Sequence, residues 1–252
     1  MSWVSVHRSH AGLVRQRNED AVLATDNQGL WIVADGMGGH AGGDVASALV
    51  CETIAALCTE GEPLARAVVR AHDAVRAKAQ SEPMLHGMGS TVVAAQAVGR
   101  QLEIAWVGDS RVYLWRNGQL GQLSRDHSFV QDMVDRGVLS AEEARVHPKK
   151  NLVNQALGQA NLHRLRVGEQ THKANADDLL LLCTDGIHDF LSDAEIAQCL
   201  GSNADLANCA EALHRAVLAT DASDNFSFIL LRAQPGPLAR WLKRLKSHFI
   251  NR

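Results

Sequence analysis

The chain has 252 residues, of which 46% are hydrophobic, so it is long enough to bury the core of one large domain or of two small ones. Its 25 basic and 28 acidic residues give a formal charge of −3, which argues against a general nucleic-acid binder. The hydrophobic content also argues against a disordered chain.

Short apolar runs bounded by Gly, Asn or Asp predict strands, and alanine-rich stretches with helical periodicity predict helices. In chain order we expect strands at 21–25 and 30–34, helices at 43–59 and 63–80, strands at 91–98, 102–107 and 112–115, short helices near 128–136 and 140–146, a strand at 179–184, a helix at 203–219 and a strand at 226–231. Asn117-Gly118 predicts a hairpin turn. Because the strands cluster rather than alternate with helices, an α+β layered domain is favoured over a doubly wound parallel sheet.

The chain divides into a body at 1–234 and a basic tail at 235–252. The tail carries five basic residues and no acidic one after a Pro-Gly-Pro sequence, and its apolar residues recur at helical spacing. Two alternatives stay open for it: packing on the body, or binding a partner or a membrane surface. Within the body, the segment 126–158 has only short helical pieces, so we expect it to leave the core as a flap.

The cysteines and the N-terminal region bear on location. The five cysteines are odd in number and include no CxxC pair, so neither a disulfide framework nor a zinc site is indicated. The first twenty residues lack the apolar stretch of a secretory signal, and no run of eighteen apolar residues occurs. We therefore expect a cytoplasmic protein without a transmembrane span, and we expect it to be a monomer.

Five aspartates follow or flank predicted strands, and four of them are next to glycine, serine or asparagine. A single aspartate at such a place is an ordinary turn or cap residue, but several on strongly apolar elements indicate convergence on one edge of the core. Their mutual repulsion would oppose folding until divalent cations bind. The residues are Asp20, Asp35, Asp109, Asp185 and Asp224.

Carboxylate and carbonyl oxygens without clustered His or Cys suit Mg²⁺ or Mn²⁺ rather than zinc. His7 and His10 lie close in sequence, but no second pair accompanies them, so we expect both to be solvated. Two such ions activate a water and clamp the oxygens of an in-line phosphoryl displacement. The expected chemistry is phosphoester hydrolysis.

Two other phosphate-related patterns fail. The glycine-rich run at 35–43 has Ala41 where a dinucleotide loop needs its third glycine, and it lacks the Lys-Ser/Thr pair of a P-loop. We expect its glycines to let the backbone approach an ion before a helix begins after Gly43. Cys209 and Arg215 have the Cys-x5-Arg spacing of cysteine-dependent phosphatases, but they lie in a helical pattern without glycine, so we interpret the spacing as accidental.

Seven motifs in order resemble those of the PPM/PP2C family of metal-dependent Ser/Thr protein phosphatases, in its bacterial form. The match runs from about residue 12 to 231, and the motifs read VRQRNED, VADGMGGHAGG, GMGSTVV, VGDSRVY, SRDHS, LCTDG and SDNFS. The resemblance implies an α-β-β-α sandwich, with two central antiparallel sheets flanked by helices and a binuclear Mn²⁺/Mg²⁺ centre at one end. It also implies hydrolysis of phosphoserine or phosphothreonine by in-line attack of a metal-bound hydroxide, on proteins phosphorylated by a Ser/Thr kinase.

The resemblance also implies roles for the acidic residues. Asp35 would bridge both ions with help from the Gly36 carbonyl, and Asp185 and Asp224 would hold the first ion.

Other positions would act around these ligands. Asp20 and Glu19 would reach the metals mainly through ordered water, and Asp109 would join Asp185 in a third, weaker metal site. Arg15 would bind the substrate phosphate, for which its planar guanidinium is suited.

The sequence departs from the family pattern at two places. Met37 stands where many eukaryotic members have a histidine discussed as the general acid, which leaves His40, with a proton-donor or a structural role, and metal-bound water as alternatives. Bacterial relatives often have a Thr-Arg pair before Ala-Leu-Gly near the end of the flap, whereas here Val153-Asn154 is followed by Gln155-Ala156-Leu157-Gly158. A non-catalytic phosphoprotein-binding regulator and a small-molecule phosphoesterase remain alternatives on the same fold.

Overall fold

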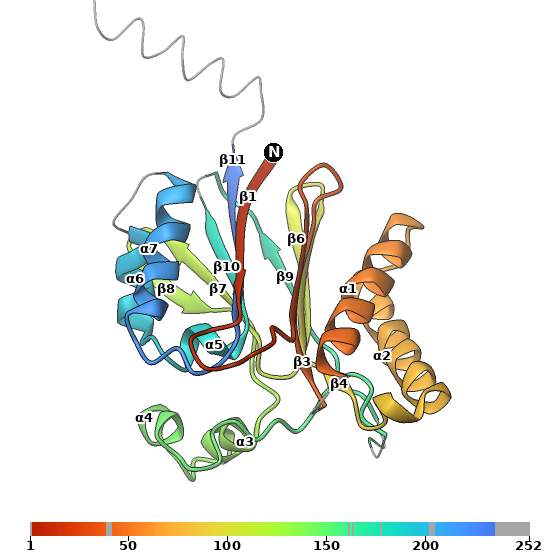
Figure 1. The fold of residues 1–252 in the computed structure, drawn as a ribbon. Helices are drawn as coiled ribbons and strands as arrows, with labels where there is room; N and C mark the ends of the chain where they lie inside the picture. Colours follow the sequence, from red (N-terminus) through yellow and green to blue (C-terminus); the bar gives the residue numbers. More distant parts are fainter. Residues whose placement is uncertain are drawn as a thin grey trace, which may run out of the picture.

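The computed structural model describes residues 2–38, 42–160, 162, 164–176, 178–201 and 205–234, and two antiparallel β-sheets stacked face to face form its centre (Figure 1). The tail at 235–252 lies outside the described residues. None of the helices in the described ranges is long and apolar enough to cross a membrane.

The first sheet has the strand order β1-β11-β10-β7-β8, with every neighbouring pair antiparallel. The expected hairpin turn at Asn117-Gly118 joins its last two strands. The strand bounds are β1 Ser2–His10, β7 Arg111–Arg116, β8 Gln119–Gln122, β10 Leu179–Cys183 and β11 Phe226–Gln234.

The second sheet has the order β2-β3-β5-β6-β9, and the two-residue strand β4 also pairs with β3. The strand bounds are β2 Asp20–Thr25, β3 Leu30–Met37, β4 Gly89–Ser90, β5 Val92–Val98, β6 Gln101–Val107 and β9 Gly168–Lys173.

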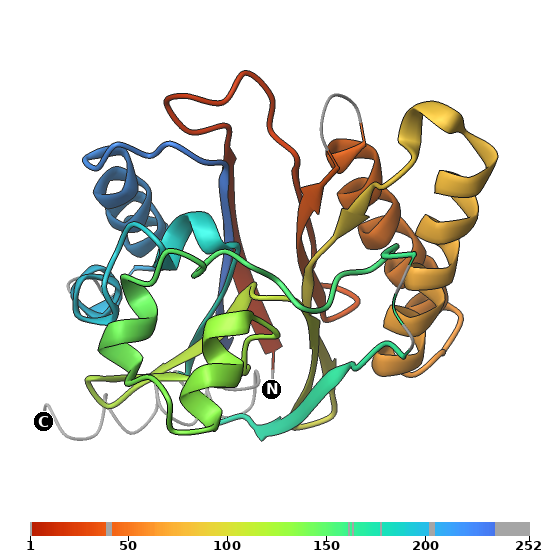
Figure 2. The same cartoon turned by 90° about the horizontal axis from the view of Figure 1, so that it is seen from below.

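Helices cover the outer face of each sheet, so the predicted α-β-β-α sandwich is confirmed (Figure 1). Helices α1 (Gly43–Thr59) and α2 (Leu64–Ser81), followed by the short η1 (Pro83–Leu85), cover the second sheet. Helices α5 (Asp185–His188), α6 (Asp193–Gly201) and α7 (Leu206–Leu218) cover the first. The short helices α3 (Phe129–Asp135) and α4 (Ala141–Arg145) lie in the expected flap, away from both sheets (Figures 1 and 2).

Strand periodicity explains why both faces of each sheet are buried. Along β10, Leu180 and Leu182 point into the layer between the sheets, whereas Leu179 and Leu181 point toward the helices. A strand buried on both faces needs apolar residues at every position, which is why the Leu-rich run is visible in the sequence.

The fold shows the surroundings of the two N-terminal histidines and of Cys209 and Arg215. His10 is not solvated as expected: its ring stacks on Phe226 with centroids 5.2 Å apart, because β1 pairs with β11 at this register. His7 is exposed. Cys209 is buried inside α7 and Arg215 pairs with Glu211 on the same helix, so the Cys-x5-Arg spacing forms no thiolate loop. All five cysteines are free.

Candidate metal and phosphate site

The five predicted aspartates come from chain segments that end or begin at one end of the sandwich, which faces the reader in Figure 2. Asp35 lies near the end of β3 and pairs across the sheet with Asp20, the first residue of β2. Asp185 begins α5 directly after β10, Asp109 follows β6, and Asp224 precedes β11. Antiparallel pairing brings these strand ends together although their positions in the sequence are up to two hundred residues apart.

Asp35 and Asp185, from different sheets, are in direct contact. The two carboxyl groups interact, and burial together with repulsion from Asp185 holds the pKa of Asp35 well above its ordinary value. The backbone of Asp35 is fixed by its neighbour strands, since its carbonyl accepts hydrogen bonds from the Thr91 amide at 2.8 Å and the Ser90 hydroxyl at 3.0 Å. This contact between the sheets is the centre of the candidate site.

Asp20 is the third member of this group. The hydroxyl of Thr184 donates a hydrogen bond to its Oδ2 atom at 3.0 Å. Its Oδ1 atom is buried and has no hydrogen-bond partner among the described residues. A buried carboxylate oxygen without a donor is costly unless a cation compensates it.

The surrounding protein shifts the titration of all four inner aspartates in the same direction. Burial raises the pKa of Asp20 to about 7, and repulsion from Asp185 adds to the effect. Burial, with repulsion from Asp189 and Asp224, raises the pKa of Asp185 to about 6. Burial and repulsion from Asp185 also raise the pKa values of Asp35 and Asp109 well above the ordinary value. Four carboxyls that all resist ionisation form a site of strong negative potential, which favours a bound cation.

Asp224 lies near this group, but its carboxylate faces Arg15. The guanidinium group binds it with two contacts of 3.0 Å, from Nη2 to Oδ2 and from Nε to Oδ1. This ion pair raises the pKa of Arg15, and both side chains are open to solvent. The structure thus joins the residue expected to bind phosphate to one expected to bind metal.

A residue that the sequence analysis missed, Asn225, organises the loop that carries Arg15. Its Nδ2 atom donates to the carbonyls of Ala11 at 3.0 Å and Arg17 at 2.8 Å, and its Oδ1 atom accepts from the Glu19 amide at 2.8 Å. One amide side chain therefore ties the loop to the start of β11. Asn225 belongs to the SDN motif, but the sequence analysis looked for charged ligands, and an amide side chain carries no charge.

Close backbone packing explains the glycines next to the site. A Cβ atom on Gly36 would lie 2.0 Å from the carbonyl oxygen of Gly43, and the Gly36 amide donates to the Glu19 carbonyl at 3.1 Å. Helix α1 begins at Gly43, as expected. Gly36 therefore allows β3, the Glu19 segment and the start of α1 to meet. His40 lies outside the described residues.

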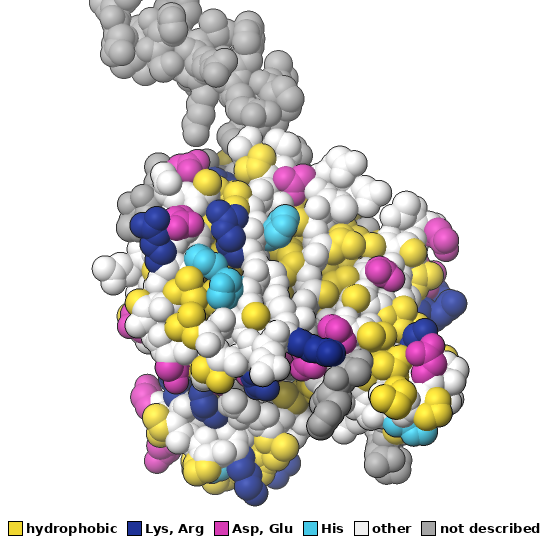
Figure 3. Space-filling view, viewed as in Figure 1, with side chains coloured by type: hydrophobic (Ala, Val, Ile, Leu, Met, Phe, Trp, Pro, Cys, Tyr) yellow, Lys and Arg dark blue, Asp and Glu magenta, His cyan; other side chains and the backbone are white. Residues whose placement is uncertain are grey.

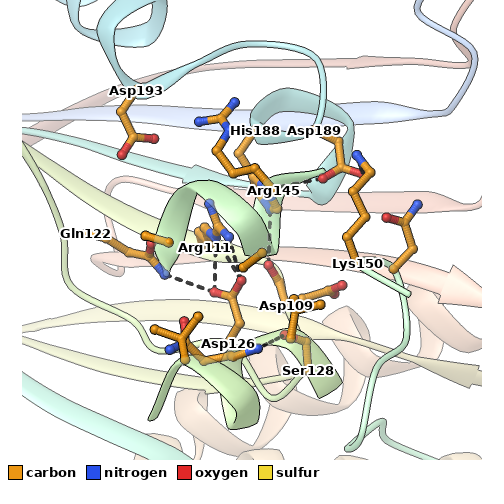
Figure 4. Close-up of a pocket in the computed structure, with 16 residues that line it drawn as sticks. Asp109, Arg111, Gln122, Asp126, Ser128, Arg145, Lys150, His188, Asp189 and Asp193 are labelled. Atoms are coloured by element: carbon orange, nitrogen blue, oxygen red, sulfur yellow. Dashed lines mark hydrogen bonds and ion pairs between the residues drawn. The ribbon is translucent and has the colours of Figure 1, made fainter. Parts of the chain in front are cut away.

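Asp109 is buried at the wall of a neighbouring cavity of about 190 Å³ between the flap and α5 (Figure 4). The Nε2–H of His188 donates to the Asp109 carbonyl at 3.1 Å, and burial holds the pKa of His188 well below its ordinary value. In the same cavity, Arg111 binds Asp126 through both carboxylate oxygens.

The flap is tied to the body beside this cavity. Lys150 forms an ion pair of 2.8 Å with Asp189, the residue that ends α5. Farther along, Asn154 donates to Asp132 at 2.8 Å and Gln155 accepts from the Arg166 amide at 3.0 Å. Both side chains thus make contacts within the flap region.

The residues fit a pair of hard cations by donor chemistry, because aspartate oxygens gather at one end of the fold and one of them, Oδ1 of Asp20, is buried without a donor. As the side chains lie, however, no three His, Cys, Asp or Glu residues of the described ranges point at one common position. Asp224 is one carboxylate that does not point at such a position, because it is paired with the guanidinium group of Arg15.

Known proteins resemble this chain over most of its length. The family model described as protein phosphatase 2C matches residues 8–226. Serine/threonine protein phosphatase PstP of Mycobacterium tuberculosis is 42% identical over 216 residues, which cover 83% of this chain and 40% of PstP. The chain therefore corresponds to less than half of that relative.

A second relative matches at nearly full length. Serine/threonine phosphatase stp of Listeria monocytogenes is 36% identical over 237 residues, covering 89% of this chain and 93% of the relative. Among solved structures, the catalytic domain of PstP in complex with two manganese ions superposes with a TM-score of 0.83 at 36% identity, covering 93% of this chain and 99% of that domain.

Proposed function

Since the chain belongs to the protein phosphatase 2C family, we propose that it is a metal-dependent phosphatase that hydrolyses phosphoserine and phosphothreonine in proteins. The observation that carries the proposal is the close approach of the Asp35 and Asp185 carboxyl groups, with Asp20 and Asp109 near enough to raise the pKa of Asp35 further. Carboxyls brought together against their own repulsion are typical of a site for hard cations.

We assign the metal ligands within this group. Asp35, with the Gly36 carbonyl, would bridge two Mn²⁺ or Mg²⁺ ions, and Asp185 and Asp224 would complete the first site. Asp20 would act through water, and Asp109 would contribute to a weaker third site. When bound, such ions supply an activated water and neutralise charge on the phosphate oxygens.

Arg15 would bind and orient the phosphate group. Its fork of N–H donors matches the geometry of two phosphate oxygens, and the loop that carries it is fixed by Asn225. Because the same guanidinium group binds Asp224 in the structure, phosphate must compete with this carboxylate. Arg15 would be free to bind the phosphate if Asp224 served as a metal ligand.

We further propose that residues 1–234 form the phosphatase domain and that the flap at 126–158 contacts the substrate protein. The substrates would be proteins phosphorylated by a Ser/Thr kinase, and the protein would act as a cytoplasmic monomer. The basic tail at 235–252 would contact the body, a partner or a membrane surface.

The test compares wild type with Asp35→Asn on a phosphothreonine peptide, with Mn²⁺ and with a chelator. We expect hydrolysis that needs metal and that falls by at least roughly a hundredfold in the variant, because a bridging carboxylate is lost. Asp73→Asn, an exposed aspartate on α2, is the matched control and should be fully active. Peptide binding without turnover in wild type would favour a non-catalytic regulator, and turnover of sugar phosphates alone would favour a small-molecule phosphoesterase.

A further inference from the structure

Two large aliphatic side chains stand in solvent directly beside Arg15. Leu13 is 60% exposed and Val14 is 66% exposed, in the loop that joins β1 to β2. Exposed apolar side chains are common when they occur singly, but Leu13 and Val14 are adjacent and together form one exposed apolar surface.

The loop that carries Leu13 and Val14 is held in place by hydrogen bonds, so poor packing of the loop does not explain why the two side chains are exposed. The Leu13 amide donates to the Ala222 carbonyl at 2.8 Å, and the Gly12 amide donates to Nδ1 of His10 at 3.0 Å. Gly12 adopts a positive φ of 76°, and a Cβ atom there would lie 2.1 Å from the Asp224 carbonyl oxygen. With the contacts of Asn225, the backbone on both sides of the pair is fixed. A loop fixed before binding loses little conformational entropy when it binds.

The position of the pair links it to the candidate site. The loop at 11–19 borders the end of the sandwich where the aspartates lie, and the flap borders it on the opposite side (Figure 2). Eight large hydrophobic side chains are exposed in the described part of the chain, and five of them lie on these two borders. Hydrophobic side chains are visible on the flap at the bottom of the space-filling view (Figure 3). The five are Leu13, Val14, Val138, Val146 and Leu152.

We infer that Leu13 and Val14 bind aliphatic side chains that flank the phosphorylated residue of a substrate protein, an inference that rests on the proposed function. With the phosphate on Arg15, the substrate chain on either side must pass over the neighbouring loop residues. An aliphatic side chain buries apolar area against the pair, whereas a charged one loses hydration there without a partner.

The test uses two phosphothreonine peptides that differ only in having leucine or serine on both sides of the phosphothreonine. The readout is the ratio of their kcat/KM values in Mn²⁺, because a ratio cancels any general loss of activity. For wild type we expect the leucine peptide to be preferred by roughly tenfold. The double variant Leu13→Ser, Val14→Ser should bring the ratio close to one.

Val98→Ser is the matched control. Val98 is also exposed, but it ends β5 beside the turn into β6, whereas Asp109 follows the opposite end of β6, and the ratio should stay as in wild type. Equal kcat/KM values for the two peptides in wild type, or a preference that persists in the double variant, would overturn the inference and leave the proposed function standing. Failure to hydrolyse either peptide would instead contradict the proposed function. Co-sedimentation of wild type with anionic phospholipid vesicles that the double variant loses, without any peptide preference, would assign the pair to a membrane surface and also overturn the inference.

Discussion

Asp20→Asn should make the metal-free protein more stable at neutral pH. The substitution keeps the shape of the side chain, and the amide oxygen can still accept the hydrogen bond that the Thr184 hydroxyl donates at 3.0 Å. It removes a charge from a carboxyl whose Oδ1 atom has no donor among the described residues and which Asp185 repels. The variant therefore isolates what ionisation of this one group costs the fold.

The sign and size of this stability difference follow from the pKa of Asp20, which burial raises from 3.8 to about 7. A folded-state pKa above the unfolded value means that the protonated group favours the folded state. That contribution is full below about pH 4 and is lost as the pH rises to about 7. At 1.36 kcal/mol per pH unit, the wild type should lose on the order of 4 kcal/mol from this group over that range.

The assay is urea denaturation in a chelator at several pH values between about 4 and 8, for wild type, Asp20→Asn and the control Asp73→Asn. We expect the free energy of unfolding of Asp20→Asn to exceed that of wild type by an increasing amount as the pH rises. Asp73→Asn should follow wild type, because its side chain is exposed. Parallel curves for wild type and Asp20→Asn would refute the reasoning, since they would mean that Asp20 ionises freely in the folded protein.

Three other changes have definite expected results. Arg15→Ala should raise KM for a phosphopeptide, while Mn²⁺ affinity, measured by calorimetry, should weaken by a smaller factor; weakening of peptide and Mn²⁺ binding by the same factor would contradict its assigned role. Gly36→Ala should destabilise the protein by more than about 3 kcal/mol in urea denaturation, because the new methyl group meets a backbone carbonyl at 2.0 Å, whereas Gly121→Ala, where the space is open, should change little. Lys150→Met breaks the ion pair with Asp189 and should speed limited proteolysis within the flap, with a change in stability below about 1 kcal/mol; an unchanged cleavage rate would mean that this pair does not hold the flap.

The strands that the sequence predicted are those buried on at least one apolar face. The run at 179–184 became β10, and the run at 30–34 became the first part of β3. The edge strand β9, Gly168–Lys173, was missed because its side chains are mostly polar and exposed, so only its hydrogen bonds to β6 define it. Strand β1 was missed for a related reason, since Ser, His and Arg interrupt its apolar residues.

The site was predictable as far as its charged residues are concerned. Asp35 and Asp185 could be identified because aspartate at the end of an apolar strand is visible in one sequence, and the structure brings them into contact. The pairing of Arg15 with Asp224 could not be predicted, because it depends on side-chain positions 209 residues apart in the chain. His10 was assigned wrongly to solvent because the strand that packs its ring against Phe226 was not recognised.

Location of manganese in a crystal of the wild-type protein, by anomalous scattering, tests the central claim most directly. The account predicts manganese bonded to the carboxylates of Asp35 and Asp185, with Asp224 turned away from Arg15. Manganese bound elsewhere, with neither Asp35 nor Asp185 among its ligands, would contradict it.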